Sequence, residues 1–116
     1  MFIEPDRRQL EASKALGAPV VELHTGTYAN AVGPARAAEL ARVREAAAYG
    51  VSIGLEVHAG HGLTFDNVRP IAAIPQIAEL NIGHFLIGEA IFVGLEASIR
   101  QMRRLMDEGR GETFGV

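Results

Sequence analysis

The sequence predicts an α/β fold in which parallel strands are joined by helices. Short runs rich in β-branched and aliphatic residues alternate with segments of helical periodicity along the chain. Residues 22–26 and 56–60 repeat one pattern, which is Glu, aliphatic, His, small and Gly. Strand-then-helix units in series produce parallel strands covered by helices. At 116 residues, 48% of them hydrophobic and 22% charged, the chain fits one globular domain.

The first unit is a short strand followed by a helix. Residues 2–3 form an apolar run. Pro5 and Asp6 then provide a turn and an N-cap for a helix whose apolar positions share one face. Gly17 is placed to end this helix, because glycine readily adopts the left-handed conformation that follows helices.

The second unit is a strand, a loop and a long helix. Residues 20–24 have the β-branched content and the length of a strand. A loop is expected from there through Gly33. Pro34 suits a first helical turn, and Ala, Leu and Val then recur at helical spacing. This helix is expected to end at Gly50 or Gly54.

The third and fourth units are shorter. Residues 55–58 read as a strand that leads into a Gly-His-Gly turn. Residues 65–73 look helical, but Pro70 and Pro75 are expected to limit the helix to two short pieces. Residues 80–82 form a fourth short strand.

The last third of the chain is expected to be helical. Residues 85–93 are apolar almost throughout and fit a strand or a helix, of which a short helix is favoured. A final helix follows, with a solvated arginine face and a frayed tail from Gly109. Its apolar stripe consists of Leu95, Ile99, Met102, Leu105 and Met106.

Composition argues against several function classes. A net charge of -3 and the lack of a basic stripe disfavour nucleic acid as a partner. Without cysteine there are no disulfides, thiolate metal sites or thiol nucleophiles, and the cytoplasm is the expected compartment. We expect no membrane partner and no signal peptide, because no apolar run approaches the ~18 residues of a span and the N-terminus lacks a basic and apolar leader.

Glu22 and His24 interrupt an otherwise aliphatic strand. Strands of parallel sheets are normally buried on both faces, so a carboxylate there needs a partner. With a period of two, both side chains project from the same face near the carboxyl end of the strand, where α/β folds place ligand chemistry. They therefore act in an active site or form a structural pair that supports a loop.

His61 stands between Gly60 and Gly62, directly after the third strand. Glycines on both sides let the backbone approach a ligand closely. Imidazole gives or takes a proton near neutral pH, so His61 suits a general acid. The alternative is a surface histidine in a turn.

Gly83 and His84 end the fourth strand and open the segment expected to be a short helix. Backbone N–H groups at a helix N-terminus bind phosphate without a basic side chain. Two neighbouring strand ends that each carry Gly and His would make one anion-binding cradle.

Other residues suggest no further site. His58 shares a face with Glu56, and the pair is interpreted as a structural support or as a contact at the bottom of the site. His58, His61 and His84 match no common zinc spacing, so no metal is expected. No dinucleotide-binding or P-loop motif occurs. The units fit a small open sheet or half of an eightfold barrel, and composition does not separate these architectures.

The chain resembles the pyridoxine 5'-phosphate synthase family. The resemblance rests on four motifs and their spacing, and it extends over essentially the whole chain. The motifs are residues 2–6, 21–29, 59–64 and 80–84.

This resemblance implies that residues 1–116 are the C-terminal half of one (β/α)8 TIM-barrel domain and supply strands five to eight. The family condenses 1-deoxy-D-xylulose 5-phosphate with 3-amino-2-oxopropyl phosphate, releasing phosphate and water without a cofactor. By resemblance, His61 is the proton donor and Glu22 stabilises the transition state. Gly62, Gly83 and His84 bind the aminoketone phosphate.

The resemblance also implies what this chain lacks. The family's catalytic base histidine, a second glutamate and the residues that hold the xylulose phosphate lie on the first four strands, so the chain alone is expected to be inactive. His58 stands where the family often has Asn. A homo-oligomer is expected, and an isolated half-barrel would expose two strand edges and an apolar inner face. The alternative function is a non-catalytic module that binds phosphorylated ligands or serves in assembly.

Overall fold

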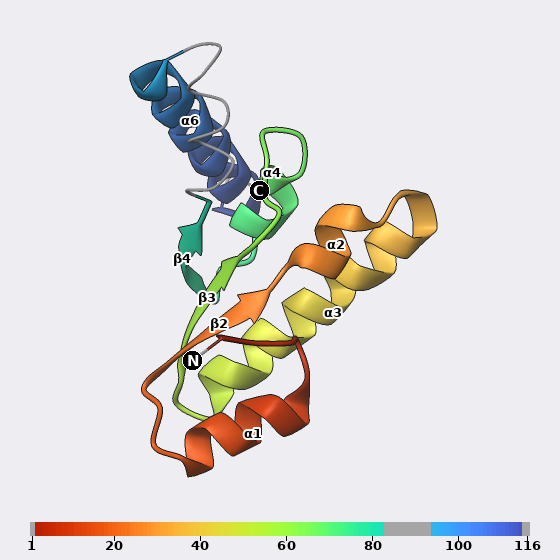
Figure 1. Cartoon of the computed structure of the whole chain (residues 1–116), viewed down its shortest axis with the longest axis vertical. Helices are drawn as coiled ribbons and strands as arrows, with labels where there is room; N and C mark the ends of the chain where they lie inside the picture. Colours follow the sequence, from red (N-terminus) through yellow and green to blue (C-terminus); the bar gives the residue numbers. More distant parts are fainter. Residues whose placement is uncertain (1, 83–93, 115–116) are drawn as a thin grey trace.

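The observed architecture is α/β, as predicted. The structure, a computed structural model, describes residues 2–82 and 94–114 (Figure 1). Its four strands form one parallel sheet in the order β1-β2-β3-β4. Sequential parallel neighbours joined by helices are compatible with half of a TIM barrel.

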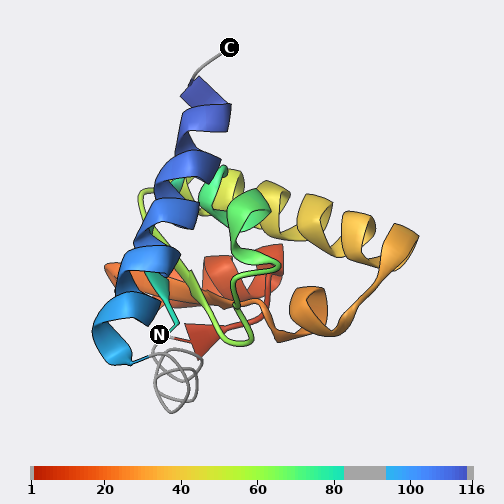
Figure 2. The same ribbon diagram turned by 90° about the horizontal axis from the view of Figure 1, so that it is seen from above.

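The elements have the following bounds. The strands are β1 (Phe2–Ile3), β2 (Val20–His24), β3 (Glu56–Gly60) and β4 (Ile77–Asn81). The helices are α1 (Arg7–Ala15), α2 (Gly26–Asn30), α3 (Gly33–Ser52), α4 (Val68–Ala72) and α6 (Leu95–Phe114). The helices α3 and α6 lie on the same side of the sheet (Figure 2).

Local signals place α1 and α3 correctly. The Asp6 side chain accepts a hydrogen bond from the Arg8 backbone N–H at 2.9 Å and so caps α1. Gly17 follows with a positive φ of 82°. Pro34 lies in the first turn of α3, and that helix ends at Ser52, between its two predicted ends.

The loop expected between β2 and α3 is wrong in part, because Gly26–Asn30 form the short helix α2. Five residues are too few to show helical periodicity. Tertiary contacts hold α2 instead: Tyr28 is 1% exposed, and its hydroxyl donates to the Asn67 carbonyl at 2.7 Å. Burial raises the pKa of the Tyr28 hydroxyl, while the charge of nearby Arg36 opposes that rise.

The prediction of two helical pieces around Pro70 is also wrong. One helix, α4, runs from Val68 to Ala72 and contains Pro70. Pro70 lies in its first turn, where backbone N–H groups have no partner within the helix, so the missing N–H costs little.

The strand β4 begins three residues earlier than expected, at Ile77. Its register with β3 shifts after Val57, since Val57 pairs with Ile77 but His58 pairs with Glu79. Ala78 is the extra residue of β4 at this shift. It interrupts the alternation of side chains that would have extended the predicted strand back to Ile77.

The helix α6 continues through Gly109 rather than fraying there. Gly109 is buried against α4: a Cβ at this position would lie 2.6 Å from the Arg69 carbonyl oxygen and 3.2 Å from Ala72 Cβ. Glycine therefore lets the two helices approach closely. Of the predicted stripe, Met102 is 1% exposed but Ile99 is 48% exposed.

This contact predicts opposite effects for two glycines of one helix. We expect Gly109→Ala to lower the free energy of unfolding by about 1–2 kcal/mol, because overpacking costs about 1–3 kcal/mol and outweighs a gain in helix propensity of at most about 1 kcal/mol. Gly111→Ala is the matched control, since a Cβ there meets nothing within 4 Å. Urea unfolding of both variants measures the difference. Equal stabilisation by both would contradict the close approach of α6 to α4.

Candidate active site

Polar side chains gather on the face of the sheet that points away from the core. Along β2, Val21 and Leu23 are fully buried among the core residues, while Glu22 and His24 alternate with them and are only partly buried. Glu22 and His24 therefore share a face, as predicted. Strand pairing extends this face into one row across the sheet, formed by Phe2, Glu22, His58 and Glu79.

The neighbours of Glu22 differ from the expected aliphatic surroundings. In register it lies between Phe2 and His58, and the Asn81 side-chain amide donates a hydrogen bond to Glu22 Oε1. The expectation of a large apolar inner face is therefore wrong for the described part of this sheet. On this face Glu22 and Glu79 each pair in register with His58 of β3.

Gly60 has no side chain and so leaves room for the Glu22 carboxylate against β3. A Cβ on Gly60 would lie 2.7 Å from Glu22 Oε2 and 2.9 Å from the Asn81 carbonyl oxygen. Asn81 was not among the site residues predicted from the sequence, although an amide in the short strand 80–82 was an available signal. The Glu22 carboxylate is thus fixed by contacts from β3 and from the strand beyond it, β4.

His61 has a strained backbone. Its φ is 88°, and it is the one non-glycine residue with positive φ among the described residues. Such a conformation costs about 1–3 kcal/mol and is found where the surrounding structure enforces it, often at functional sites. The buried Thr25 hydroxyl lies 2.8 Å from the Gly60 carbonyl oxygen and 2.7 Å from the His61 carbonyl oxygen, to which it donates.

The His61 ring stacks on His24. The ring centroids are 4.4 Å apart and the planes are inclined by 26°. Phe2 lies beside His24, with ring centroids 4.9 Å apart. The sequence predicted that His24 acts with Glu22 in an active site or forms a structural pair with it, and in the structure the aromatic neighbour of His24 is His61. Register explains this, because His24 pairs with Gly60, the residue before His61.

The loop after His61 is held by Asn67. Its side chain accepts from the Thr64 backbone N–H at 2.8 Å and donates to the Gly62 carbonyl at 3.1 Å. Gly62 has a φ of 77°, and a Cβ there would lie 2.7 Å from Ala29 Cβ. Gly62 is therefore needed for the close approach of this loop to α2.

The residues Glu56, His58 and Glu79 form a separate cluster on the same face. His58 Nε2 lies 2.6 Å from Glu56 Oε2, and His58 Nδ1 lies 3.6 Å from Glu79 Oε2. The predicted contact between His58 and Glu56 is present. His58 precedes His61 by three residues and lies in the middle of β3.

Two predicted site residues, Gly83 and His84, lie outside the described residues. Within the described ranges, no three side chains of the metal-ligating types form a group that could hold an ion. No helix in those ranges is long and apolar enough to cross a membrane.

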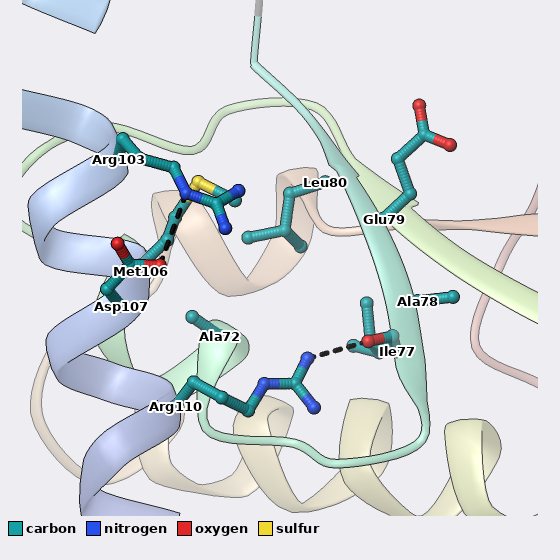
Figure 3. Close-up of a pocket in the computed structure, with 9 residues that line it drawn as sticks. All are labelled: Ala72, Ile77, Ala78, Glu79, Leu80, Arg103, Met106, Asp107 and Arg110. Atoms are coloured by element: carbon teal, nitrogen blue, oxygen red, sulfur yellow. Dashed lines mark hydrogen bonds and ion pairs between the residues drawn. The ribbon is translucent and has the colours of Figure 1, made fainter. Parts of the chain in front are cut away.

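A small pocket lies elsewhere, between β4 and α6 (Figure 3). It has a volume of about 150 Å³ and is lined in part by Leu80, Met106 and Arg110. Arg110 donates to the Ile77 carbonyl at 2.7 Å and so ties α6 to the sheet. Neither Glu22 nor His61 lines this pocket. Its contacts pack α6 against β4 and suggest no reaction.

The arrangement at the end of the sheet suits acid chemistry on a ligand. The Glu22 carboxylate extends from the middle of β2 to Gly60 and Asn81, the last residues of β3 and β4, and the His61 imidazole follows directly after Gly60. Ligands of α/β folds bind at the carboxyl ends of parallel strands. Glu22 supplies negative charge there, and His61 supplies a group that transfers protons.

Comparison with known proteins gives consistent matches. The sequence model of the family described as "Pyridoxal phosphate biosynthesis protein PdxJ" matches residues 1–108. The pyridoxine 5'-phosphate synthase of Zymomonas mobilis subsp. mobilis is 66% identical over 112 residues, which are 97% of this chain and 44% of that protein. That of Rhodospirillum rubrum is 66% identical over 108 residues, covering 92% of this chain and 43% of the relative.

A third relative, the pyridoxine 5'-phosphate synthase of Ruegeria pomeroyi, is 59% identical over 114 residues, or 95% of this chain and 46% of that protein. The chain thus spans a little under half the length of these curated relatives. The family match extends over nearly the whole chain, from β1 into α6. The chain therefore belongs to the family of the pyridoxal phosphate biosynthesis protein PdxJ.

Proposed function

We propose that this chain contributes part of the active site of a pyridoxine 5'-phosphate synthase, in vitamin B6 biosynthesis. The reaction is the ring-closing condensation of 1-deoxy-D-xylulose 5-phosphate with 3-amino-2-oxopropyl phosphate, which releases phosphate and water. The observation that carries the proposal is the position of the Glu22 carboxylate beside Gly60 and Asn81, the last residues of β3 and β4, with His61 directly after Gly60 in a strained conformation. In this proposal the sheet corresponds to strands five to eight of the barrel.

In this proposal His61 is the proton donor. Condensation of an amine with a carbonyl expels water, and a hydroxyl leaves readily only when an acid protonates it. The rigid turn around His61 supports this role, because a donor must be held in a fixed position to act in a transition state. No cofactor is required for these steps.

Glu22 stabilises positive charge that develops on the substrate nitrogen during the condensation. A fixed carboxylate does this well, because its position is set before the reaction. Its contacts with Asn81 and with the backbone at Gly60 support such a preset position. Gly62, Gly83 and His84 bind the phosphate of the aminoketone, mainly through backbone N–H groups.

A chimera tests the proposal. In it, this chain replaces the matching 112 residues of the Zymomonas mobilis relative. We expect the purified chimera to form pyridoxine 5'-phosphate from both substrates, and the 116-residue chain alone to form none. A well-folded chimera without product would refute the proposal, whereas product from the chain alone would refute its dependence on other strands.

We also propose that the isolated chain self-associates through its strand edges. Within the described residues, β1 and β4 each pair with a strand on one side only, and an unpaired edge is a template for another strand. Sedimentation of the chain is expected to show dimers or larger species. Ala78→Lys should weaken this association, because a charge on an edge strand opposes pairing. A monomer at all concentrations would contradict the expectation.

A further inference from the structure

The stacked rings of His24 and His61 lie where β2 and β3 end. Their ring centroids are 4.4 Å apart. The contacts of His24 therefore bear directly on the position of the His61 ring.

The Gly26 backbone N–H donates to His24 Nδ1 at 3.2 Å. A ring nitrogen that accepts a hydrogen bond carries no proton, so this contact favours the His24 tautomer with the proton on Nε2. The Glu4 carboxylate also faces Nδ1, but its oxygen lies 3.8 Å away, beyond hydrogen-bond distance. Phe2 covers His24 with an apolar ring.

The space around these rings is narrow. A Cβ on Gly26 would lie 2.3 Å from His24 Cε1 and 2.9 Å from His61 Cδ2. Gly26 thus lets the start of α2 approach both rings and present its N–H to His24. The Thr25 hydroxyl, one residue earlier, binds the carbonyl oxygen of His61 at 2.7 Å. Consecutive residues at the end of β2 therefore contact both the ring and the backbone of His61.

We propose that His24 and Thr25 are positioning residues for His61. His24, whose Nδ1 accepts from the Gly26 N–H, supports the His61 ring by stacking. The Thr25 hydroxyl binds the strained backbone of His61 and so fixes the direction of the His61 ring. The proposal deepens the proposed function and rests on it for the role of His61, but its structural content is measurable without activity.

Nitrogen-15 NMR of the histidine rings in the unmodified chain is the first test. We expect the neutral form of His24 to be the tautomer with the proton on Nε2, because Nδ1 accepts from the Gly26 N–H. The tautomer with the proton on Nδ1 would overturn the proposal. This measurement needs no variant, so it stands even if a substitution impairs folding.

Variants then test the stacking of His24 on His61 and the hydrogen bond from the Thr25 hydroxyl to the His61 backbone. His24→Ala should shift the His61 ring-proton resonances downfield through loss of the ring current, whereas His58→Ala, the matched control, should leave them in place. Thr25→Val should shift the His61 backbone amide, and Thr25→Ser, which keeps the hydroxyl, should restore it. Unchanged His61 resonances in both His24→Ala and Thr25→Val would overturn the proposal.

Kinetics of the chimera separate this proposal from the proposed function. Here His24→Ala should lower kcat by up to about 10²-fold with little change in KM, because a misplaced acid impairs chemistry more than binding. An inactive chimera would refute the synthase function and leave the NMR results as the test of positioning. An active chimera with unchanged kcat in His24→Ala would refute positioning alone.

Discussion

His61→Asn in the chimera is expected to lower turnover by roughly 10²- to 10⁴-fold, the usual contribution of a positioned proton donor. Asparagine suits this test because it tolerates the left-handed backbone that His61 adopts, with φ at 88°. The turn should therefore persist while the acid is lost. Steady-state turnover with both substrates measures the effect.

His58→Asn is the control for this prediction. It makes the same change of side chain three residues earlier, within β3, in the cluster with Glu56 and Glu79. We expect it to change turnover little, because the proposed mechanism gives His58 no role. A normal rate in His61→Asn would remove His61 from the reaction, and equal losses in both variants would indicate a general structural effect.

Glu22→Gln is expected to lower turnover by about 10²- to 10³-fold, as for the loss of one fixed electrostatic contact to a transition state. Glutamine retains an oxygen that accepts the hydrogen bond from the Asn81 amide, so the variant removes charge and preserves geometry. KM should change less than kcat, since the charge acts on the developing cation.

The matched control is Glu56→Gln, a second glutamate on the same face of the sheet. Its carboxylate contacts His58 rather than the strand ends, and its side chain is 57% exposed. We expect nearly normal turnover. If Glu22→Gln were as active as this control, negative charge at position 22 would have no part in the rate.

Local sequence signals predicted most elements, because they depend on neighbours in the chain. The Asp6 cap, Gly17 and the alternation of Val20–His24 all act within a few residues. The shared face of Glu22 and His24 also follows from the strand period alone. The errors at α2, β4 and Gly109 concern features that distant residues decide.

Strand register is the clearest example of what the sequence did not determine. The repeated patterns at 22–26 and 56–60 suggest equivalent positions, with Glu22 beside Glu56. In the sheet the two strands are staggered by two residues, so Glu22 pairs with His58 and His24 with Gly60. This stagger brings His24 to His61, and it depends on packing of whole strands against the helices.

The sequence by itself determined the α/β class, most of the strands and helices, and the residue types available for acid chemistry. Tertiary structure alone decided that Asn81 anchors Glu22, that Thr25 holds the strained His61 and that Gly109 lies against α4. The physical reason is the separation along the chain over which each interaction acts. Periodicity and capping act over a few residues, whereas these contacts join residues more than 30 positions apart and exist only once the sheet and its helices have packed.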